Sequence, residues 1–119
     1  MTIQIFIVLA GLMGAAGVVL AAASAHGTPG AGLDSAGYLL LVHAAAVLGG
    51  VGLVHQGLTS RTIGLIALVG FVLGGAMFAG DVAARAYLGH RLFPMAAPTG
   101  GMILIASWLI LAVAALAGR

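Results

Sequence analysis

The residues of this sequence that could do chemistry are few, and the candidates for a polar cluster are His26, His43, Asp81, Arg85 and His90. Asp81 and Arg85 stand four residues apart with the acid first, which is the favourable order for an ion pair along a helix. Such a pair at the end of a helix would be structural. An ionisable pair inside a membrane would instead indicate a proton or ion path. The sequence leaves both interpretations open.

A metal ion would need imidazole and carboxylate ligands, because the chain has no cysteine. The candidate ligands, with thioethers added for Cu(I), are His26, His43, His90, Asp81, Met77, Met95 and Met102. No two of these histidines have a ligand spacing such as i, i+4, so we predict no metal site and no cofactor. A neutral His43 among alanines then needs a hydrogen bond, for which backbone or a hydroxyl of a neighbouring helix is the expected partner.

Acid–base or nucleophilic catalysis has no constellation in this chain. The sequence contains no Glu, Lys or Cys, and no serine lies in a nucleophile-elbow motif. We therefore predict that the protein is not an enzyme and has no catalytic residue.

Composition indicates where the protein resides. Of 119 residues, 63% are hydrophobic and 5% are charged, against roughly 25% charged in an ordinary soluble domain. So few polar groups cannot cover a water-soluble globule, and most of the surface must face lipid. The four arginines are scattered along the chain, which excludes a basic patch for nucleic acid.

Four stretches are long and apolar enough to cross a hydrocarbon core, which takes about 20 residues. They cover about 3–25, 38–57, 62–82 and 100–117, and Gly, Pro, Ser and Thr at 27–32, 59–60 and 93–98 mark the turns between them. We predict an all-α fold, in which residues 1–119 form one antiparallel bundle of four transmembrane helices. The mixture of aromatic, aliphatic and basic residues at 85–99 predicts a short interfacial helix before the last span.

Small residues at helical spacing indicate how these helices associate, because helices in lipid pack through close backbone contact. The predicted packing glycines are Gly14, Gly17, Gly49, Gly70, Gly74, Gly100 and Gly101. Asp81 shares a helical stripe with Gly70 and Gly74, so its carboxylate should point into the bundle. Hinges in a moving gate are the alternative interpretation of these glycines.

Four spans joined by short loops must alternate in direction, so one membrane face collects most of the polar residues. That face receives His26, Asp34, Tyr38, Asp81, Arg85, Tyr87, His90 and Arg91, with His43 about one and a half turns into the membrane. The other face receives Gln4, His55, Gln56, Arg61 and Arg119. Each face holds two arginines. We expect both termini in the cytoplasm, because Arg61 lies in a very short loop and Arg119 closely follows the last span.

Several motifs together resemble a known family. They lie at 11–14, 24–26, 43–48, 74–80 and 97–101, and the most specific is Pro-x-Gly-Gly at 98–101 with Trp108 seven residues further on. The chain resembles, over nearly its whole length, the small four-helix inner-membrane proteins of the domain of unknown function 423 family. This family is also called uncharacterised protein family 0382, and its eukaryotic relatives are transmembrane protein 256.

The resemblance implies a four-span architecture and brings no established activity. The chain departs from the family where Phe-Ser-Gly-Ser-Leu-Tyr is usual, since residues 78–83 read Phe-Ala-Gly-Asp-Val-Ala. Leu39 also stands where the family has an aromatic residue, four before the histidine at position 43.

These observations predict a small integral protein of a bacterial inner membrane that acts by binding. The expected partners are membrane lipids, with a membrane-protein partner or a second copy of the chain as further candidates. The alternative is a small transporter or metal-handling protein whose path uses the polar cluster. A homo-oligomer would suit that alternative better, because one four-helix bundle encloses little room for a pore.

Overall fold

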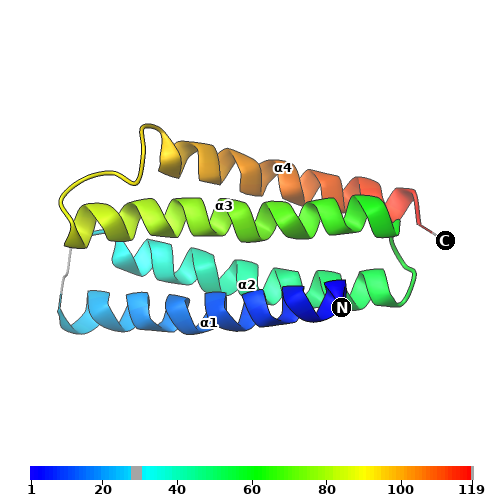
Figure 1. Ribbon diagram of the computed structural model, residues 1–119, viewed down its shortest axis with the longest axis horizontal. Coiled ribbons are helices and arrows are strands. Elements are labelled where there is room, and N and C mark those ends of the chain that lie inside the picture. The colour runs from blue at the N-terminus through cyan, green and yellow to red at the C-terminus, as the bar shows by residue number, and fades with distance from the viewer. Residues whose placement is uncertain (28–30, 119) are drawn as a thin grey trace.

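The computed structural model describes residues 1–27 and 31–118, and these residues form four helices. They are α1 (Thr2–His26), α2 (Leu33–His55), α3 (Arg61–Tyr87) and α4 (Ala96–Leu116), which alternate in direction along one long axis (Figure 1). Each helix is long and apolar enough to cross a membrane. The predicted bundle of four transmembrane helices is confirmed, and the chain has the architecture of a small multi-pass integral membrane protein.

The longest dimension of the molecule is 47 Å, close to the roughly 40–45 Å of a bilayer with its headgroup layers. The ends of the helices therefore reach the headgroup layers. The predicted turn residues at 28–30 and Arg119 at the C-terminus lie outside the described residues.

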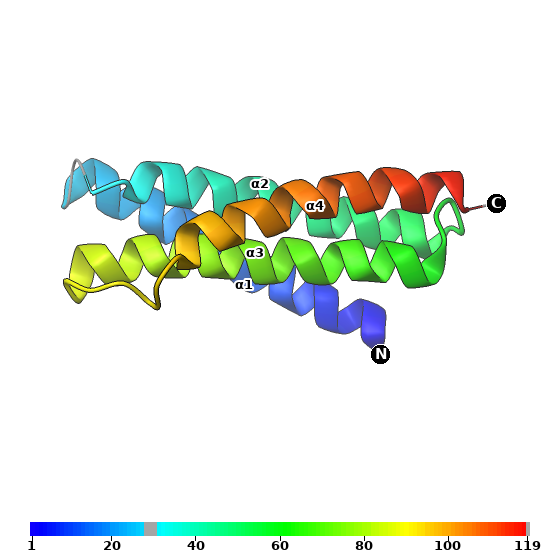
Figure 2. The same cartoon turned by 90° about the horizontal axis from the view of Figure 1, so that it is seen from above.

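The four helices pack mainly with their neighbours in the chain. α1 packs on α2, α2 on α3 and α3 on α4, whereas α1 meets α3 only briefly. Figure 2 shows the N-terminal half of α1 diverging from the other helices. The bundle is consequently open along one side, between α1 and α3.

Two helix crossings depend on paired glycines. At the α1–α2 crossing, a Cβ on Gly17 would lie 2.8 Å from the carbonyl oxygen of Gly37, and a Cβ on Gly37 would lie 2.7 Å from that of Gly17. At the α3–α4 crossing, Gly74 and Gly100 have the same relation, at 2.8 Å in both directions. These distances are too short for a Cβ atom. The backbones can therefore touch only because the residues are glycines.

The other predicted packing glycines differ in their surroundings. Gly70 faces the side chain of Ser107, and a Cβ on Gly14 would make only ordinary contact with Ala44 at 3.9 Å. A Cβ on Gly49 or Gly101 would meet nothing within 4 Å. The prediction that Gly49 and Gly101 mediate packing is wrong, because both glycines face away from the neighbouring helices.

Aliphatic and aromatic side chains fill the space between the crossings. One buried cluster joins α1, α2, α3 and α4 around Phe71, with Leu68, Val47 and Leu104 against it. A second, nearer the polar face, is built on Leu33, Ala36, Leu40 and Met13. Phe71 of the first cluster also packs against the ring of buried His43.

The helix ends extend beyond the predicted spans on the polar face. α2 begins at Leu33, five residues early, because Leu33 and Ala36 are buried and Asp34 favours a helix N-terminus. α4 begins at Ala96 and contains Pro98 in its first turn, where the missing N–H leaves no helical hydrogen bond unmade.

The predicted interfacial helix at 85–99 does not form. Residues 85–87 continue α3, residues 96–99 belong to α4, and 88–95 between them are irregular. Gly89 and Met95 have φ values of 76° and 66°, in the left-handed region that interrupts a helix. The connection is therefore a loop with two sharp turns.

Candidate functional site

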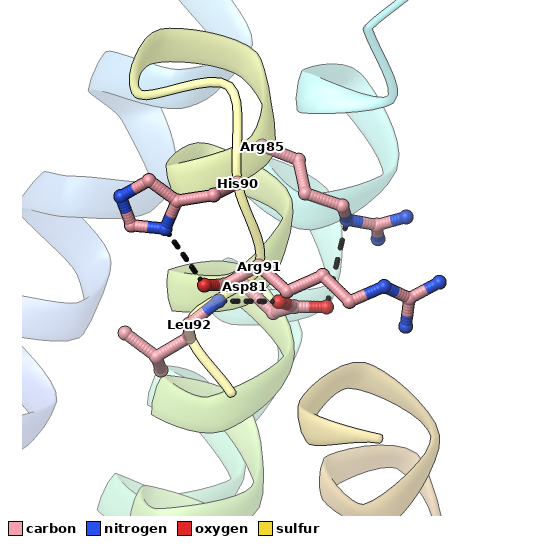
Figure 3. A network of polar contacts seen from close by, with 5 residues as sticks. All are labelled: Asp81, Arg85, His90, Arg91 and Leu92. Atoms are coloured by element: carbon pink, nitrogen blue, oxygen red, sulfur yellow. Dashed lines mark hydrogen bonds and ion pairs between the residues drawn. The ribbon is translucent and has the colours of Figure 1, made fainter. Parts of the chain in front are cut away.

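The 88–95 loop folds back along the end of α3 and is held there by Asp81. Because α3 extends past the start of α4, the loop must return beside the last turns of α3 (Figure 1). The backbone N–H of Leu92 donates a hydrogen bond to Oδ1 of Asp81 at 2.9 Å (Figure 3). Asp81 is fully buried, so its carboxylate points inward as the glycine stripe predicts.

The second oxygen of Asp81 faces Arg85. Oδ2 lies 3.5 Å from Nε of Arg85, one turn later on α3, and the Arg85 side chain is 45% exposed. This contact is an ion pair without hydrogen-bond geometry, and Oδ2 has no hydrogen-bond partner among the described residues. A half-exposed pair of this kind stabilises a protein little. Arg85 therefore keeps donors that can serve another acceptor.

Arg91 brings a second guanidinium to the same place. It precedes Leu92, so the bond to Asp81 fixes the position of its backbone, and His90 Nδ1 donates to the Arg91 carbonyl oxygen at 2.9 Å. Figure 3 shows the side chains of Arg85 and Arg91 extending to the same side of α3. In the part of the chain that the structure describes, no acidic oxygen lies within 4 Å of the Arg91 guanidinium.

A hollow of about 400 Å³ lies beside Arg85, at the start of α2. Its lining is Ala31, Gly32, Val82, Arg85 and Ala86. The exposed residues around the loop include Tyr87, Leu88, Phe93 and Met95, which suit the apolar side of the headgroup layer. We call Arg85, Arg91 and this hollow the arginine ledge, an arrangement that can accept an anion at the membrane surface.

His43 is buried in the bundle rather than at the ledge. Its Nδ1–H donates to the Leu39 carbonyl oxygen at 2.7 Å, and its Nε2 accepts from the indole Nε1–H of Trp108 at 3.1 Å. Because a carbonyl only accepts and an indole N–H only donates, both nitrogens are satisfied by a neutral ring. The partners are thus the same helix and an indole, instead of the backbone or hydroxyl of a neighbouring helix.

Aromatic packing completes the surroundings of His43. Its ring centroid lies 5.6 Å from that of Phe71 and 5.9 Å from that of Trp108, and the last two rings are 4.7 Å apart at 61°. The three side chains come from α2, α3 and α4. This group therefore joins three helices at one depth in the membrane.

The five residues predicted as one polar cluster are not brought together. Asp81 and Arg85 are in contact and His90 lies on the adjoining loop, but His43 and Asp81 share no partner, and His26 is exposed at the end of α1. Among residues 1–27 and 31–118, no three His or acidic side chains are placed to hold a metal ion.

Neither Trp108 as the partner of His43 nor Arg91 as a member of the polar site was identified from the sequence. An indole N–H within lipid must find an acceptor, so the sequence could have suggested that the single tryptophan pairs with one of the two histidines in the second span, His43 or His55. Arg91 gave no such signal, because its position follows from the backbone bond between Leu92 and Asp81.

The opposite end of the molecule has a different character. There the N–H of Ser60 donates to the Ala114 carbonyl oxygen at 2.8 Å, which ties the second loop to α4. A hollow of about 430 Å³ is lined by His55, Ser60 and Arg61 together with residues near the C-terminus. Within that lining, Arg61 is the one arginine.

Comparisons of this chain with protein-family models, curated proteins and solved structures found no match.

Proposed function

We propose that this protein is a lipid-binding, non-enzymatic protein of a bacterial inner membrane, and that the arginine ledge holds the phosphate of an anionic phospholipid headgroup. We further propose membership of the domain of unknown function 423 family, on the motifs described above. The observation that carries the lipid proposal is the placement of two guanidiniums on one side of α3, where the bond from Leu92 to buried Asp81 fixes the backbone next to Arg91.

The chemistry of the ledge suits a phosphodiester. Guanidinium groups present several N–H donors in a plane that matches phosphate oxygens, and they remain charged at all physiological pH values. Asp81 offsets part of the Arg85 charge through the ion pair, so Arg91 contributes the larger uncompensated charge. Together the two arginines favour a lipid with a net negative headgroup over a zwitterionic one.

The test is the lipid preference of the purified protein in nanodiscs. Spin-labelled phosphatidylglycerol and phosphatidylcholine are compared at low salt, and the ratio of their association constants is measured. We expect Arg91→Gln to lower the preference for phosphatidylglycerol about fivefold, the effect of roughly 1 kcal/mol per basic residue near a charged surface. Arg85→Gln should lower it less, because Asp81 already offsets that charge.

Two controls separate the ledge from overall charge. Arg61→Gln removes the same charge at the opposite face and should reduce the preference less than Arg91→Gln does. Raising the salt concentration should reduce the wild-type preference, because exposed charges are screened. An equal ratio for wild type and Arg91→Gln would contradict the proposal.

A further inference from the structure

A groove runs along the open side of the bundle, between α1 and α3. One hollow of about 470 Å³ lies between Leu12 and Val19 of α1 and the segment of α3 that contains Ala76, Gly80 and Ala83. A second hollow of about 320 Å³ continues from Ala76 towards Val69. Ala76 lines both hollows, so they form one path, which we call the α1–α3 groove.

The groove follows from two features of the sequence. α3 presents small side chains on this side, at Ala76, Ala79, Gly80 and Ala83, while α1 presents longer aliphatic ones. α1 also touches α3 only briefly and diverges towards its N-terminus (Figure 2). The lining is hydrocarbon throughout, so its occupant must be apolar.

The dimensions of the groove indicate what kind of molecule it can bind. From Val69 to Ala83 the groove follows α3 for about 21 Å, at about 1.5 Å per residue. A helix about 10 Å wide would fill on the order of 1,700 Å³ over that length, about twice the volume of the two hollows together. An acyl chain crossing one leaflet of about 15 Å, with a width of about 5 Å, fills about 300 Å³. An acyl chain therefore fits within the groove, whereas a helix would lie largely outside it.

The loop end of the groove is compatible with a lipid headgroup. A Cβ on Gly80 would lie 3.5 Å from Cδ2 of Leu92, so the 88–95 loop borders the groove at this end. His90 and Leu92 extend from the loop on the side away from the two guanidiniums (Figure 3). Residues 88–95 contain no acidic side chain, so the loop does not repel a phosphate at the head of an apolar chain.

We propose that the α1–α3 groove binds one acyl chain of a phospholipid from the leaflet on the loop side, with its phosphate at the level of the 88–95 loop. The groove is distinct from the arginine ledge, because neither arginine lines it. Chain binding here depends on shape and apolar surface, and it does not require a net negative headgroup.

Photo-crosslinking in vesicles tests this proposal. The probe is phosphatidylcholine with a photoactivatable diazirine midway along one acyl chain, and the crosslinked peptides are quantified by mass spectrometry. We expect crosslinks to concentrate on residues 12–20 and 69–83. Ala76→Phe should reduce them about tenfold, the loss expected when about two methylene groups lose their contacts. Ala106→Phe, the same change at an exposed alanine of α4, should leave the pattern unaltered.

Several results would overturn the groove proposal, and they can be told apart. Crosslinks spread evenly over all four helices of the wild type would overturn the proposal, whatever the variants do. If Ala76→Phe lowers the melting temperature more than Ala106→Phe does, the crosslinking is repeated with Ala83→Phe, a substitution at the loop end of the groove. An unchanged pattern in the folded variant would overturn the proposal. So would crosslinking of Ala76→Cys to a second copy, because the groove would then face a partner chain.

The crosslinking and the nanodisc measurement together separate the groove proposal from the proposal for the arginine ledge. Groove crosslinks that persist in Arg91→Gln, together with an unaltered phosphatidylglycerol preference, would contradict the ledge alone. Loss of groove specificity with a retained headgroup preference would contradict the groove alone.

Discussion

At the scale of residues, one hydrogen bond inside the bundle joins two side chains that are far apart in the sequence. The indole of Trp108 and the imidazole of His43 are 65 residues apart in the chain, and each satisfies the other where water is absent. Phe71 packs against both rings. The group therefore sets the relative register of α2, α3 and α4 as well as contributing to stability.

We predict a measurable coupling between His43 and Trp108. Trp108→Phe keeps an aromatic ring but removes the donor, and His43→Phe removes the acceptor. Each should destabilise the protein, and a double-mutant cycle should give a coupling free energy of about 1 kcal/mol, typical of interhelical hydrogen bonds in membranes. Unfolding in mixed detergent micelles measures this. A coupling indistinguishable from zero would show that the bond contributes nothing to stability.

Asp81 should act mainly as an anchor for the 88–95 loop. Asp81→Asn keeps an oxygen that can accept from the Leu92 N–H, so we expect a loss of under about 1 kcal/mol. Asp81→Ala removes the acceptor and should cost about 1–3 kcal/mol. Hydrogen exchange of the Leu92 amide is the direct measurement, with faster exchange expected in Asp81→Ala only. Equal protection in Asp81→Ala and wild type would rule out the anchor.

At the scale of elements, two helix pairs are each joined at a glycine crossing. α1 meets α2 at Gly17 and Gly37, and α3 meets α4 at Gly74 and Gly100. Because every such backbone contact is within 3 Å of where a Cβ would lie, even alanine must push the helices apart. Gly49 on α2 and Gly101 on α4 have no atom within 4 Å of where a Cβ would lie, so they have no such requirement.

Alanine substitutions should separate these two groups of glycines. We expect Gly37→Ala and Gly100→Ala to lower the free energy of unfolding by about 1–3 kcal/mol, the usual effect of overpacking. Gly49→Ala and Gly101→Ala serve as matched controls on α2 and α4. They should be neutral or stabilise by up to about 1 kcal/mol, since alanine favours helix over glycine. Melting in detergent distinguishes the groups, and equal effects in all four variants would contradict the crossings.

At the scale of the whole molecule, four spans place both termini on the same side of the membrane. The start of α1 and the end of α4 lie towards the end that carries the second loop, and the 88–95 loop lies at the other end (Figure 1). The arginine ledge and the loop end of the α1–α3 groove therefore face the leaflet opposite the termini.

We predict that both termini are cytoplasmic, because Arg61 and Arg119 are basic and lie close to the spans on that face. A reporter enzyme that is active only after export should be inactive when fused to the C-terminus. The same reporter inserted in the 88–95 loop should be active. The reverse pattern would place the arginine ledge in the cytoplasmic leaflet.

The transporter alternative predicts proton flux or bound metal. We expect reconstituted wild-type protein to move protons no faster than empty vesicles and to carry no stoichiometric metal, because the neutral His43 ring has both nitrogens engaged. Flux or one metal per chain that disappears in His43→Phe or Asp81→Asn would establish the alternative.

Hydropathy and residue spacing are enough to predict the helical class, the four spans and the inward direction of Asp81. A hydrocarbon core admits only segments whose backbone groups are satisfied internally, so about 20 apolar residues in a row already specify a helix. Tertiary structure alone decided which glycines meet a neighbour. Gly49 and Gly50 are adjacent in sequence, yet only Gly50 faces α3, because the rotation of each helix is set by packing and not by hydropathy. It also decided that Trp108 meets His43 and not His55, that the loop returns to Asp81, and that a groove forms beside α1. Each of these joins residues far apart in the chain, whose distances depend on how the helices lie against one another.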